Sequence, residues 1–290
     1  MGERITDLTE TGSVDDNDLL TFVDVSDTLY STNGTNKKVQ KVNLLKGLVP
    51  ENGWIPAEET WTYASADAPT FTFTISGDKT SKYSVGMKIK LTQTTVKYFI
   101  VTAISYSSPN TTVTVYGGTD YTLANATITN PYYSTMKAPQ GFPVSPDKWS
   151  VTVTDSSDRN QSNPTAGQKY NISALNITIP IGNWNIYYQF TLYVTRATNG
   201  IADVRATLST TDNSESTNSF TSMFIVRGTT DGQRVDGQGT TTKQLRLVTT
   251  SKTPYYTNMW TTASNITAIG ILGASVYGST SIIRATCAYL

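Results

Sequence analysis

Apolar residues and threonines alternate one for one along several stretches of this sequence, and this pattern limits the fold more than any other feature. Phe71, Phe73 and Ile75 are separated by threonines, and a Gly-Asp turn signal follows at 77–78. A period of two places every second side chain on the same face of a strand, and β-branched threonine suits the face that meets water. The pattern predicts half-buried antiparallel β-sheet.

The same alternation recurs along most of the chain. In the first half it predicts strands in MKIKLTQ, VKYFIVTAISY, NTTVTVYGG and DYTLANATIT. In the second half it predicts strands near residues 149–153, 175–179, 184–194, 202–208, 220–226, 245–248, 266–272 and 282–289. About eight strands at this spacing are typical of a β-sandwich or jelly roll. The polar stretch TTDGQRVDGQGTTTK is predicted as a hairpin tip between two of them.

Composition divides the chain into four parts. Residues 1–50 hold too little apolar surface for a core of their own and are predicted as an N-terminal arm. Residues 51–138 form a β-rich middle domain, and residues 147–290 form the C-terminal sandwich. The segment between them, 139–146, carries three prolines and is predicted as an extended linker.

The arm contains a short apolar strand, which the sequence marks as an attachment element. Its candidate attachment residues are Leu19, Leu20, Phe22, Val23 and Val25. A strand of this length is not stable alone, so we expect it to pair with an edge that another protein offers.

A second pattern in the arm has a period of three. Val39, Val42, Leu45 and Leu48 recur at this spacing, which fits either a helical stripe or an extended seam between three copies of the chain.

Residue types limit the chemistry. The chain has no histidine and a single cysteine, Cys287, which excludes Ser-His-Asp triads, HExxH zinc sites and Cys-His nucleophiles. We therefore expect no catalytic residue, no metal ligand and no cofactor. Glycoside hydrolysis by two carboxylates is the enzymatic alternative that stays open. Glu215, however, is the only glutamate after residue 60.

Charge and hydropathy limit the partners and the location. Lysine and arginine number 22 and so do aspartate and glutamate, which argues against a nucleic-acid binder. No apolar run approaches the roughly 18 residues of a membrane span, and no signal peptide is expected at the start. The composition is that of an extracellular β protein without an export signal. A virion component, assembled in the host cytoplasm and released by lysis, satisfies both observations.

Aromatic residues supply the candidate receptor contacts. The stretch TPYYTNMW is interpreted as a loop that presents Tyr255, Tyr256 and Trp260, whose rings could stack on the apolar faces of a glycan. The same rings could instead plug the end of the sandwich or a trimer axis.

Two segments carry a resemblance to a known class of proteins. ITDLTETGSVDDNDLLTFVDVSD with KKVQKVNLLKG resembles the amino-terminal segments of bacteriophage tail-fibre and head-fibre proteins, which dock onto the virion. ITIPIGNWNIYYQFTLYV with IIRATCAYL resembles the trimeric C1q- and TNF-like jelly rolls that cap viral fibres. The resemblance implies a homotrimeric virion fibre or spike, attached to capsid, neck or baseplate by its arm.

Assembly also has support from the residues themselves. Tyr187 and Tyr193 lie on the opposite face of WNIYYQFTLYV from the even-numbered apolar set, and a subunit contact would cover them. The function predicted is adhesion of the C-terminal domain to a host-surface glycan without cleavage. A decoration or collar protein without a receptor and a carboxylate-dependent polysaccharide depolymerase are the alternatives.

Overall fold

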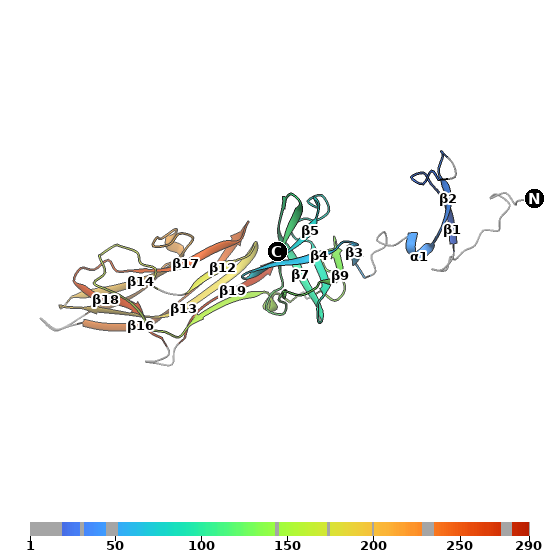
Figure 1. Cartoon of the computed structure of the whole chain (residues 1–290). Coiled ribbons are helices and arrows are strands. Elements are labelled where there is room, and N and C mark those ends of the chain that lie inside the picture. Colours follow the sequence, from blue (N-terminus) through green and yellow to red (C-terminus); the bar gives the residue numbers. More distant parts are fainter. Residues whose placement is uncertain are drawn as a thin grey trace, which may run out of the picture.

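The computed structural model describes residues 19–29, 32–44, 52–142, 145–172, 175–198, 200–227, 235–273 and 280–289. These residues are almost entirely antiparallel β-sheet, arranged as one hairpin, one seven-stranded sheet and two facing sheets (Figure 1). Within the described ranges the only α-helix is the four-residue α1, Lys41–Leu44. Two short 3-10 turns occur elsewhere in these ranges, at Pro146–Lys148 and Asn218–Phe220. The predicted all-β fold class is confirmed.

The arm folds as a hairpin that stands apart from the two β domains (Figure 1). Strand β1, Leu19–Asp24, pairs antiparallel with β2, Thr35–Gln40, and α1 follows directly. The apolar strand predicted at Leu19 is therefore present. The period of three is not a continuous helix, because Val39 lies in β2 and only Val42 lies in α1. Leu45 and Leu48 fall outside the described residues.

The middle domain is a single seven-stranded antiparallel sheet. Its strands, in sheet order, are β3 Ile55–Pro56, β9 Thr129–Ser134, β6 Lys88–Thr92, β7 Val96–Ser107, β8 Asn110–Tyr116, β5 Thr70–Ser76 and β4 Trp61–Asp67. The alternating apolar residues predicted from the sequence form its core, and Phe73, Ile89, Val101 and Val113 are fully buried. The register of the strands places these side chains on one face of the sheet, with Phe73 opposite Val113 and Val101 opposite Val115.

One predicted strand of the middle domain is wrong. DYTLANATIT is a loop up to residue 128, and β9 begins only at Thr129. The Gln93 amide explains the difference: it donates hydrogen bonds to the carbonyl oxygens of Ala124 and Ala126, at 2.9 and 3.0 Å. A side chain thus satisfies backbone groups that a neighbouring strand would otherwise pair. Leu123 is still buried, so its apolar character reflects packing from a loop.

The C-terminal domain is a sandwich of two antiparallel sheets. The larger contains β10 Ser150–Asp155, β19 Ser281–Tyr289, β13 Gly182–Arg196, β18 Ile266–Ile271, β11 Arg159–Ser162 and β16 Val235–Thr249. The smaller contains β12 Asn176–Ile179, β17 Thr253–Trp260, β14 Ile201–Ser209 and β15 Ser222–Arg227. The core between them includes Trp184, Phe190, Val204 and Leu208, all fully buried.

Strand β13 organises the sandwich. It pairs with β16 along its whole length, from Gly182 opposite Thr249 to Arg196 opposite Val235. On its other side it pairs first with β19 and then with β18. Its even-numbered residues face the core, as the alternation predicted, because a central strand of a sandwich buries one face completely.

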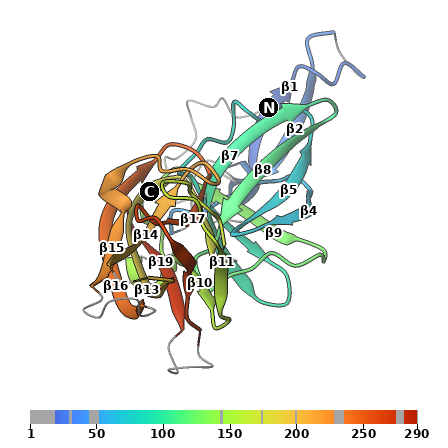
Figure 2. The same cartoon turned by 90° about the vertical axis from the view of Figure 1, so that its left-hand side faces the viewer.

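Of the stretch predicted as a hairpin tip, residues 229–234 lie outside the described residues, and the rest is strand because β16 begins at Val235. Gly237 and Gly239, which lie in this strand, reflect packing rather than a turn. Strands β15 and β16 belong to different sheets but run side by side along one edge of the sandwich (Figure 2). A Cβ atom on Gly237 would lie 2.7 Å from the side chain of Val226, so only glycine admits the neighbouring strand here.

The two domains share a core. Tyr116 of the middle domain packs edge-on against Trp149 and against Trp184 of the sandwich, and its hydroxyl donates a hydrogen bond to the Ser150 carbonyl at 2.8 Å. On the outside of the junction, Lys252 forms an ion pair with Asp67. The junction therefore holds buried apolar surface as well as polar contacts, as a rigid domain interface does.

The segment expected to be an extended linker takes part in this junction. Phe142 is buried and stacks on Trp149 with ring centroids 5.7 Å apart. The indole NH of Trp54 donates to the Gln140 carbonyl at 2.7 Å. After the undescribed residues 143–144, a 3-10 turn at Pro146–Lys148 leads into β10. The described parts of the segment are thus packed between the domains, because its aromatic residue is more favourably buried than exposed.

Candidate interaction surfaces

The arm presents apolar side chains to solvent. Leu19, Val23 and Val25 are 56%, 53% and 74% exposed, and Leu20 is exposed as well. Of the predicted attachment residues only the Phe22 side chain lies outside what the structure describes, although its backbone pairs with Lys37 in β2. Leu19, Leu20 and Val23 thus lie exposed on β1, and Val25 lies exposed in the turn that follows this strand.

Polar contacts at the turn hold this hairpin in register. Asp24 accepts hydrogen bonds from the backbone NH and hydroxyl of Ser26, and these lower the pKa of its carboxyl. Asp27 forms an ion pair with Lys37, with 2.5 Å between carboxylate and amine, and this contact lowers the pKa of Asp27. Gly34 has φ of +106°, a conformation that L side chains rarely adopt. Local contacts therefore shape the hairpin without a core beneath it.

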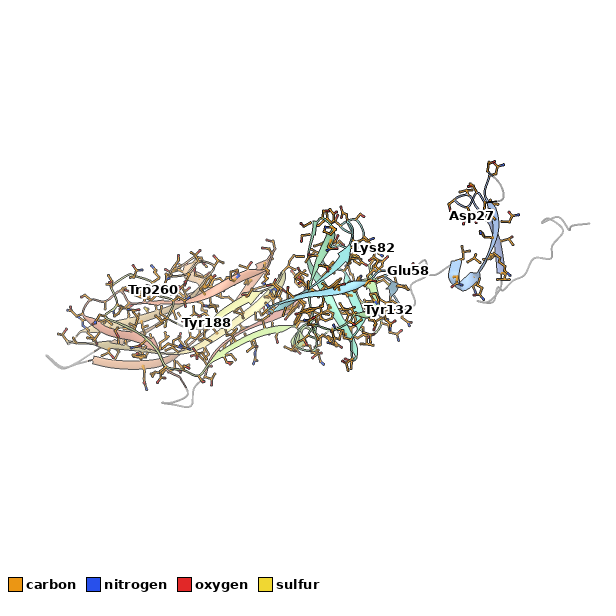
Figure 3. All side chains as sticks on the ribbon, viewed as in Figure 1. Asp27, Glu58, Lys82, Tyr132, Tyr188 and Trp260 are labelled. Carbon is orange, nitrogen blue, oxygen red and sulfur yellow. The ribbon has the colours of Figure 1, made fainter. Side chains whose placement is uncertain are left out.

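The candidate receptor aromatics lie in a strand and not in a loop. TPYYTNMW is strand β17, whose odd and even residues face opposite sides of the smaller sheet. Tyr255 is buried in the core of the sandwich. Trp260, which Figure 3 labels within the C-terminal domain, is buried on the other face of the sheet. Tyr256 is partly exposed. The rings of Tyr255 and Trp260 are therefore not available to stack on a glycan. This corrects the interpretation of TPYYTNMW as a loop.

Loops cover the outer face of the smaller sheet around Trp260. The amine of Lys169 lies 5.1 Å from the indole centroid, and it also approaches Glu215 at 4.0 Å. The amide of Asn258 donates to the carbonyl oxygens of Thr211 and Ser214, which fastens a second loop over the sheet. An all-β pattern cannot reveal such a cover, because the loops that form it have no periodicity.

The outer face of the larger sheet is open and polar. Asn185 lies opposite Arg246, Tyr187 opposite Gln244, and Gln189 opposite Thr242 across the β13–β16 pair. On the other side of β13, Tyr187 lies opposite Arg284, whose side chain is exposed. We call this set of side chains the polar face. Tyr187 and Tyr193, predicted to lie opposite the core residues, do lie on this side and are partly buried.

An apolar strip that the sequence analysis missed lies on the edge of the smaller sheet. Ile201 of β14 and Met223 and Ile225 of β15 are all about half exposed, and they lie on the face turned away from the core. We call these three residues the apolar strip. The sequence carries a signal for this strip, because both the odd-numbered and the even-numbered positions of SMFIVR hold apolar residues.

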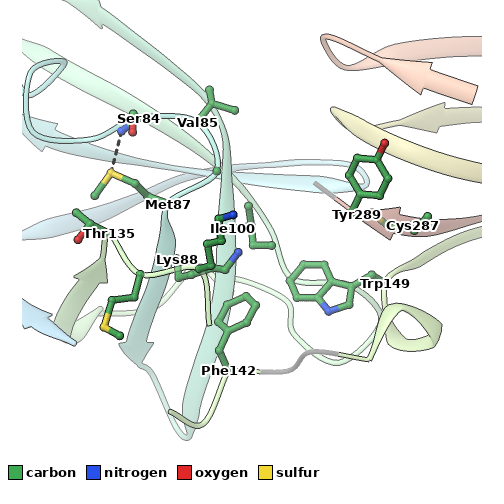
Figure 4. Close-up of a pocket in the computed structure, with 14 residues that line it drawn as sticks. Ser84, Val85, Met87, Lys88, Ile100, Thr135, Phe142, Trp149, Cys287 and Tyr289 are labelled. Carbon is green, nitrogen blue, oxygen red and sulfur yellow. Dashed lines mark hydrogen bonds between the residues drawn. The ribbon is translucent and has the colours of Figure 1, made fainter. Parts of the chain in front are cut away.

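A cleft of about 670 Å³ lies at the junction of the two domains (Figure 4). Met87, Lys88 and Ile100 of the middle domain line one side, and Trp149 and Tyr289 of the sandwich line the other. Sequence reasoning missed this site because its walls come from segments that are far apart along the chain.

Candidate metal ligands do not cluster in the part of the chain that the structure describes. No group of three or more His, Cys, Asp or Glu side chains close enough to hold a metal ion occurs among the described residues. Cys287 is buried, and burial raises the pKa of its thiol to about 12. Of the helices described, none has the length and apolar character to cross a membrane.

Comparison with known proteins gives no family. No protein-family model matches the sequence, and no curated protein matches it. The solved structures that match show only a weak likeness to this chain. The structure of the Gx strain of infectious bursal disease virus is 14% identical, over 90% of this chain and 68% of that chain, with a TM-score of 0.25. T=1 particles derived from infectious bursal virus give 12% identity, 83% and 71% coverage, and a TM-score of 0.26.

The third structure is dimeric latent PorU from Porphyromonas gingivalis. It is 8% identical over 79% of this chain, has a TM-score of 0.25, and is so much longer that this chain covers 24% of it. Because these TM-scores are so low, the architecture of this chain is described from its own strand pairings.

Proposed function

We propose that this chain is a structural fibre or spike protein of a bacteriophage virion, anchored through its N-terminal arm to a capsid, neck or baseplate protein. The single observation that carries the proposal is the exposed apolar strand of the arm. Leu19, Val23 and Val25 are each more than half exposed on a hairpin that has no core of its own. Apolar side chains in such a position gain about 25 cal/mol per Å² when a partner covers them.

The geometry of the hairpin suits docking. A two-stranded hairpin is marginally stable alone, so covering one face or pairing one edge stabilises it. Its turn is already ordered by the Asp27–Lys37 ion pair, which reduces the entropy that docking must overcome.

The experiment introduces Leu19→Asp together with Val23→Asp in the full chain and measures incorporation into particles. We expect incorporation to fall at least tenfold, because burying two carboxylates in an apolar contact costs several kcal/mol. Val96→Asp is the matched control, since Val96 is a 45% exposed valine of the middle domain. Normal incorporation of the double variant would refute the attachment role.

Assembly into a homotrimer is the second part of the proposal. A closed three-fold ring uses a heterologous interface, in which two different patches of one subunit meet those of its neighbours. The chain offers two such patches on the C-terminal domain, the apolar strip and the polar face with Tyr187. The aromatic and arginine side chains of the polar face are the types enriched at protein interfaces.

The third part is adhesion of the C-terminal domain to a host-surface glycan without cleavage. Three equivalent weak sites on one trimer, and several trimers on one particle, would bind firmly through effective concentration. The polar face carries the Asn, Gln and Thr groups that hydrogen-bond sugar hydroxyls, and what a subunit contact leaves open could serve this purpose.

Fluorescently labelled full chain, added to host cells and to their isolated wall glycans, tests this part. Saturable binding with no released sugar supports adhesion, whereas release of reducing ends favours a carboxylate-dependent depolymerase. Absence of binding to every cell that the particle infects would leave a purely structural head, collar or tail decoration. The burial of Tyr255 and Trp260 favours this last alternative, because it removes the aromatic platform expected from the sequence.

A further inference from the structure

The cleft between the two domains has the form of a small-molecule site. Its volume of about 670 Å³ lies within the usual 300–1,000 Å³ of ligand pockets, and such pockets favour domain interfaces. The shared aromatic core behind it fixes the two walls relative to each other. Phe142 and Trp149, which line the cleft, are stacked on one another at an interplanar angle of 20°.

The walls combine apolar surface with one sign of charge. Met87, Ile100, Phe142 and Trp149 supply apolar atoms, and Lys88 and Lys137 supply amines. Of the described residues that line the cleft, none is an aspartate or a glutamate. The cleft therefore combines an electropositive character with an apolar interior.

Lys88 is the central polar group. Its amine lies 5.1 Å from the centroid of the Phe142 ring, and Figure 4 shows its side chain reaching into the cleft. Burial lowers the pKa of this amine, with no carboxylate partner to offset the desolvation among the described residues. An ammonium group that is partly stripped of water and has only an aromatic face opposite it lacks a counter-charge.

We propose that this cleft binds a small amphipathic carboxylate, with the carboxylate on the amine of Lys88 and the apolar body against Phe142, Trp149 and Met87. The charge complementarity selects an anion, and the aromatic walls select an apolar body. Neither the arm nor the apolar strip and the polar face of the C-terminal domain line this cleft, so the site is independent of the surfaces proposed for attachment and adhesion.

The test uses the full chain with 4-phenylbutyrate as the anionic probe and 4-phenylbutyramide as its uncharged counterpart of equal size. Calorimetry and ligand-observed NMR at pH 7 should show saturable binding of the acid with Kd of about 1 mM or tighter. The amide should bind at least about tenfold more weakly, because it cannot pair with the ammonium group.

Two variants locate the site. Lys88→Gln removes the charge, and Val85→Trp fills the cleft from an exposed position on its rim. Each should weaken binding of the acid at least about tenfold, whereas Lys38→Gln, at an exposed position of the arm, should leave it unchanged. Equal affinity for acid and amide, unchanged binding by Lys88→Gln, or no saturable binding below about 5 mM would each overturn the proposal.

Discussion

Of the carboxylates in the described part of the chain, that of Asp203 accepts the most hydrogen bonds. It lies buried on β14 and accepts hydrogen bonds from the backbone NH groups of Thr262 and Ala263, at 3.0 and 3.1 Å, and from the hydroxyls of Thr261 and Thr262. Arg205 supplies the compensating charge at 3.0 Å. The turn after β17 is therefore built around one acidic side chain.

Asp203→Ala should lower the free energy of unfolding by about 3 kcal/mol, because it leaves the Thr262 NH and the Arg205 guanidinium without their buried partner. Chemical denaturation of the purified chain measures this change. Asp212→Ala is the control: Asp212 accepts only a local bond from the Asn213 NH on the surface, and its loss should cost less than about 0.5 kcal/mol. Equal effects of the two substitutions would contradict the role given to Asp203.

Lys88 predicts a pH dependence of stability. Burial lowers the pKa of its amine below the 10.5 of the unfolded chain, so the native state releases the proton at lower pH than the unfolded state. Between the two pKa values the unfolded chain binds more protons, and the free energy of unfolding therefore rises with pH up to about 10.5. Lys88→Met should remove this rise and increase stability at pH 7. Denaturation curves from pH 7 to 10.5 compare the two chains, and parallel profiles would contradict the prediction.

At the scale of elements, the pairing of β14 with β15 creates the apolar strip. Met223 and Ile225 alternate with Phe224 and Val226, which face the core, so both sides of β15 are apolar. A strand at the edge of a sheet with an apolar outer face normally needs a cover. In the trimer that we propose, the polar face of the neighbouring subunit supplies it.

Met223→Asp combined with Ile225→Asp should convert the trimer into monomers. Two carboxylates buried at the contact cost at least about 3 kcal/mol, which weakens association more than 100-fold. Native mass spectrometry at micromolar protein reads the outcome, with Val96→Asp as the matched control. A monomeric wild-type chain, or an intact trimer of the double variant, would exclude this contact.

At the scale of the whole molecule, the aromatic junction decides whether the two domains behave as one body. Trp149 contacts Phe142 and Tyr116, and both rings come from the segments N-terminal to the sandwich. Trp149→Ala should cost about 3–5 kcal/mol and split a single unfolding transition into two, because each domain keeps its own sheet core. Differential scanning calorimetry tests this, and Val96→Ala serves as an exposed control. One unshifted transition would contradict the coupling role given to Trp149.

The sequence predicted the structure best where apolar side chains repeat with the two-residue period of a β-strand. The core faces of β13 and β19 follow from alternation alone, because an antiparallel strand with one buried face repeats every two residues. The exposed apolar strand of the arm could be predicted too, since its length and its polar surroundings leave it without a core.

Contacts between segments distant in the chain could not be predicted in the same way. The linker was expected to be extended because of its prolines, yet Phe142 packs into the domain junction. The sequence pattern predicts a strand at 120–129, and only the Gln93 amide shows why a loop there can bury Leu123 and Ile128. TPYYTNMW contains Pro254 and polar residues typical of a loop, but Pro254 is tolerated in β17 opposite Thr178 of the short strand β12.

The register of β10 with β19 has a mechanical consequence. Ser150 lies opposite Thr286, so the strand that enters the C-terminal domain and the last described strand meet at the same end, beside the middle domain. The opposite end of the sandwich contains no chain terminus within the described residues (Figure 1). Consider a force that pulls on this opposite end while the arm is held fixed. Such a force runs parallel to the strands, so it loads all the hydrogen bonds between β13 and β16 in shear at the same time. The same force applied between the first and last strands would peel β10 from β19 one bond after another, at a much lower load.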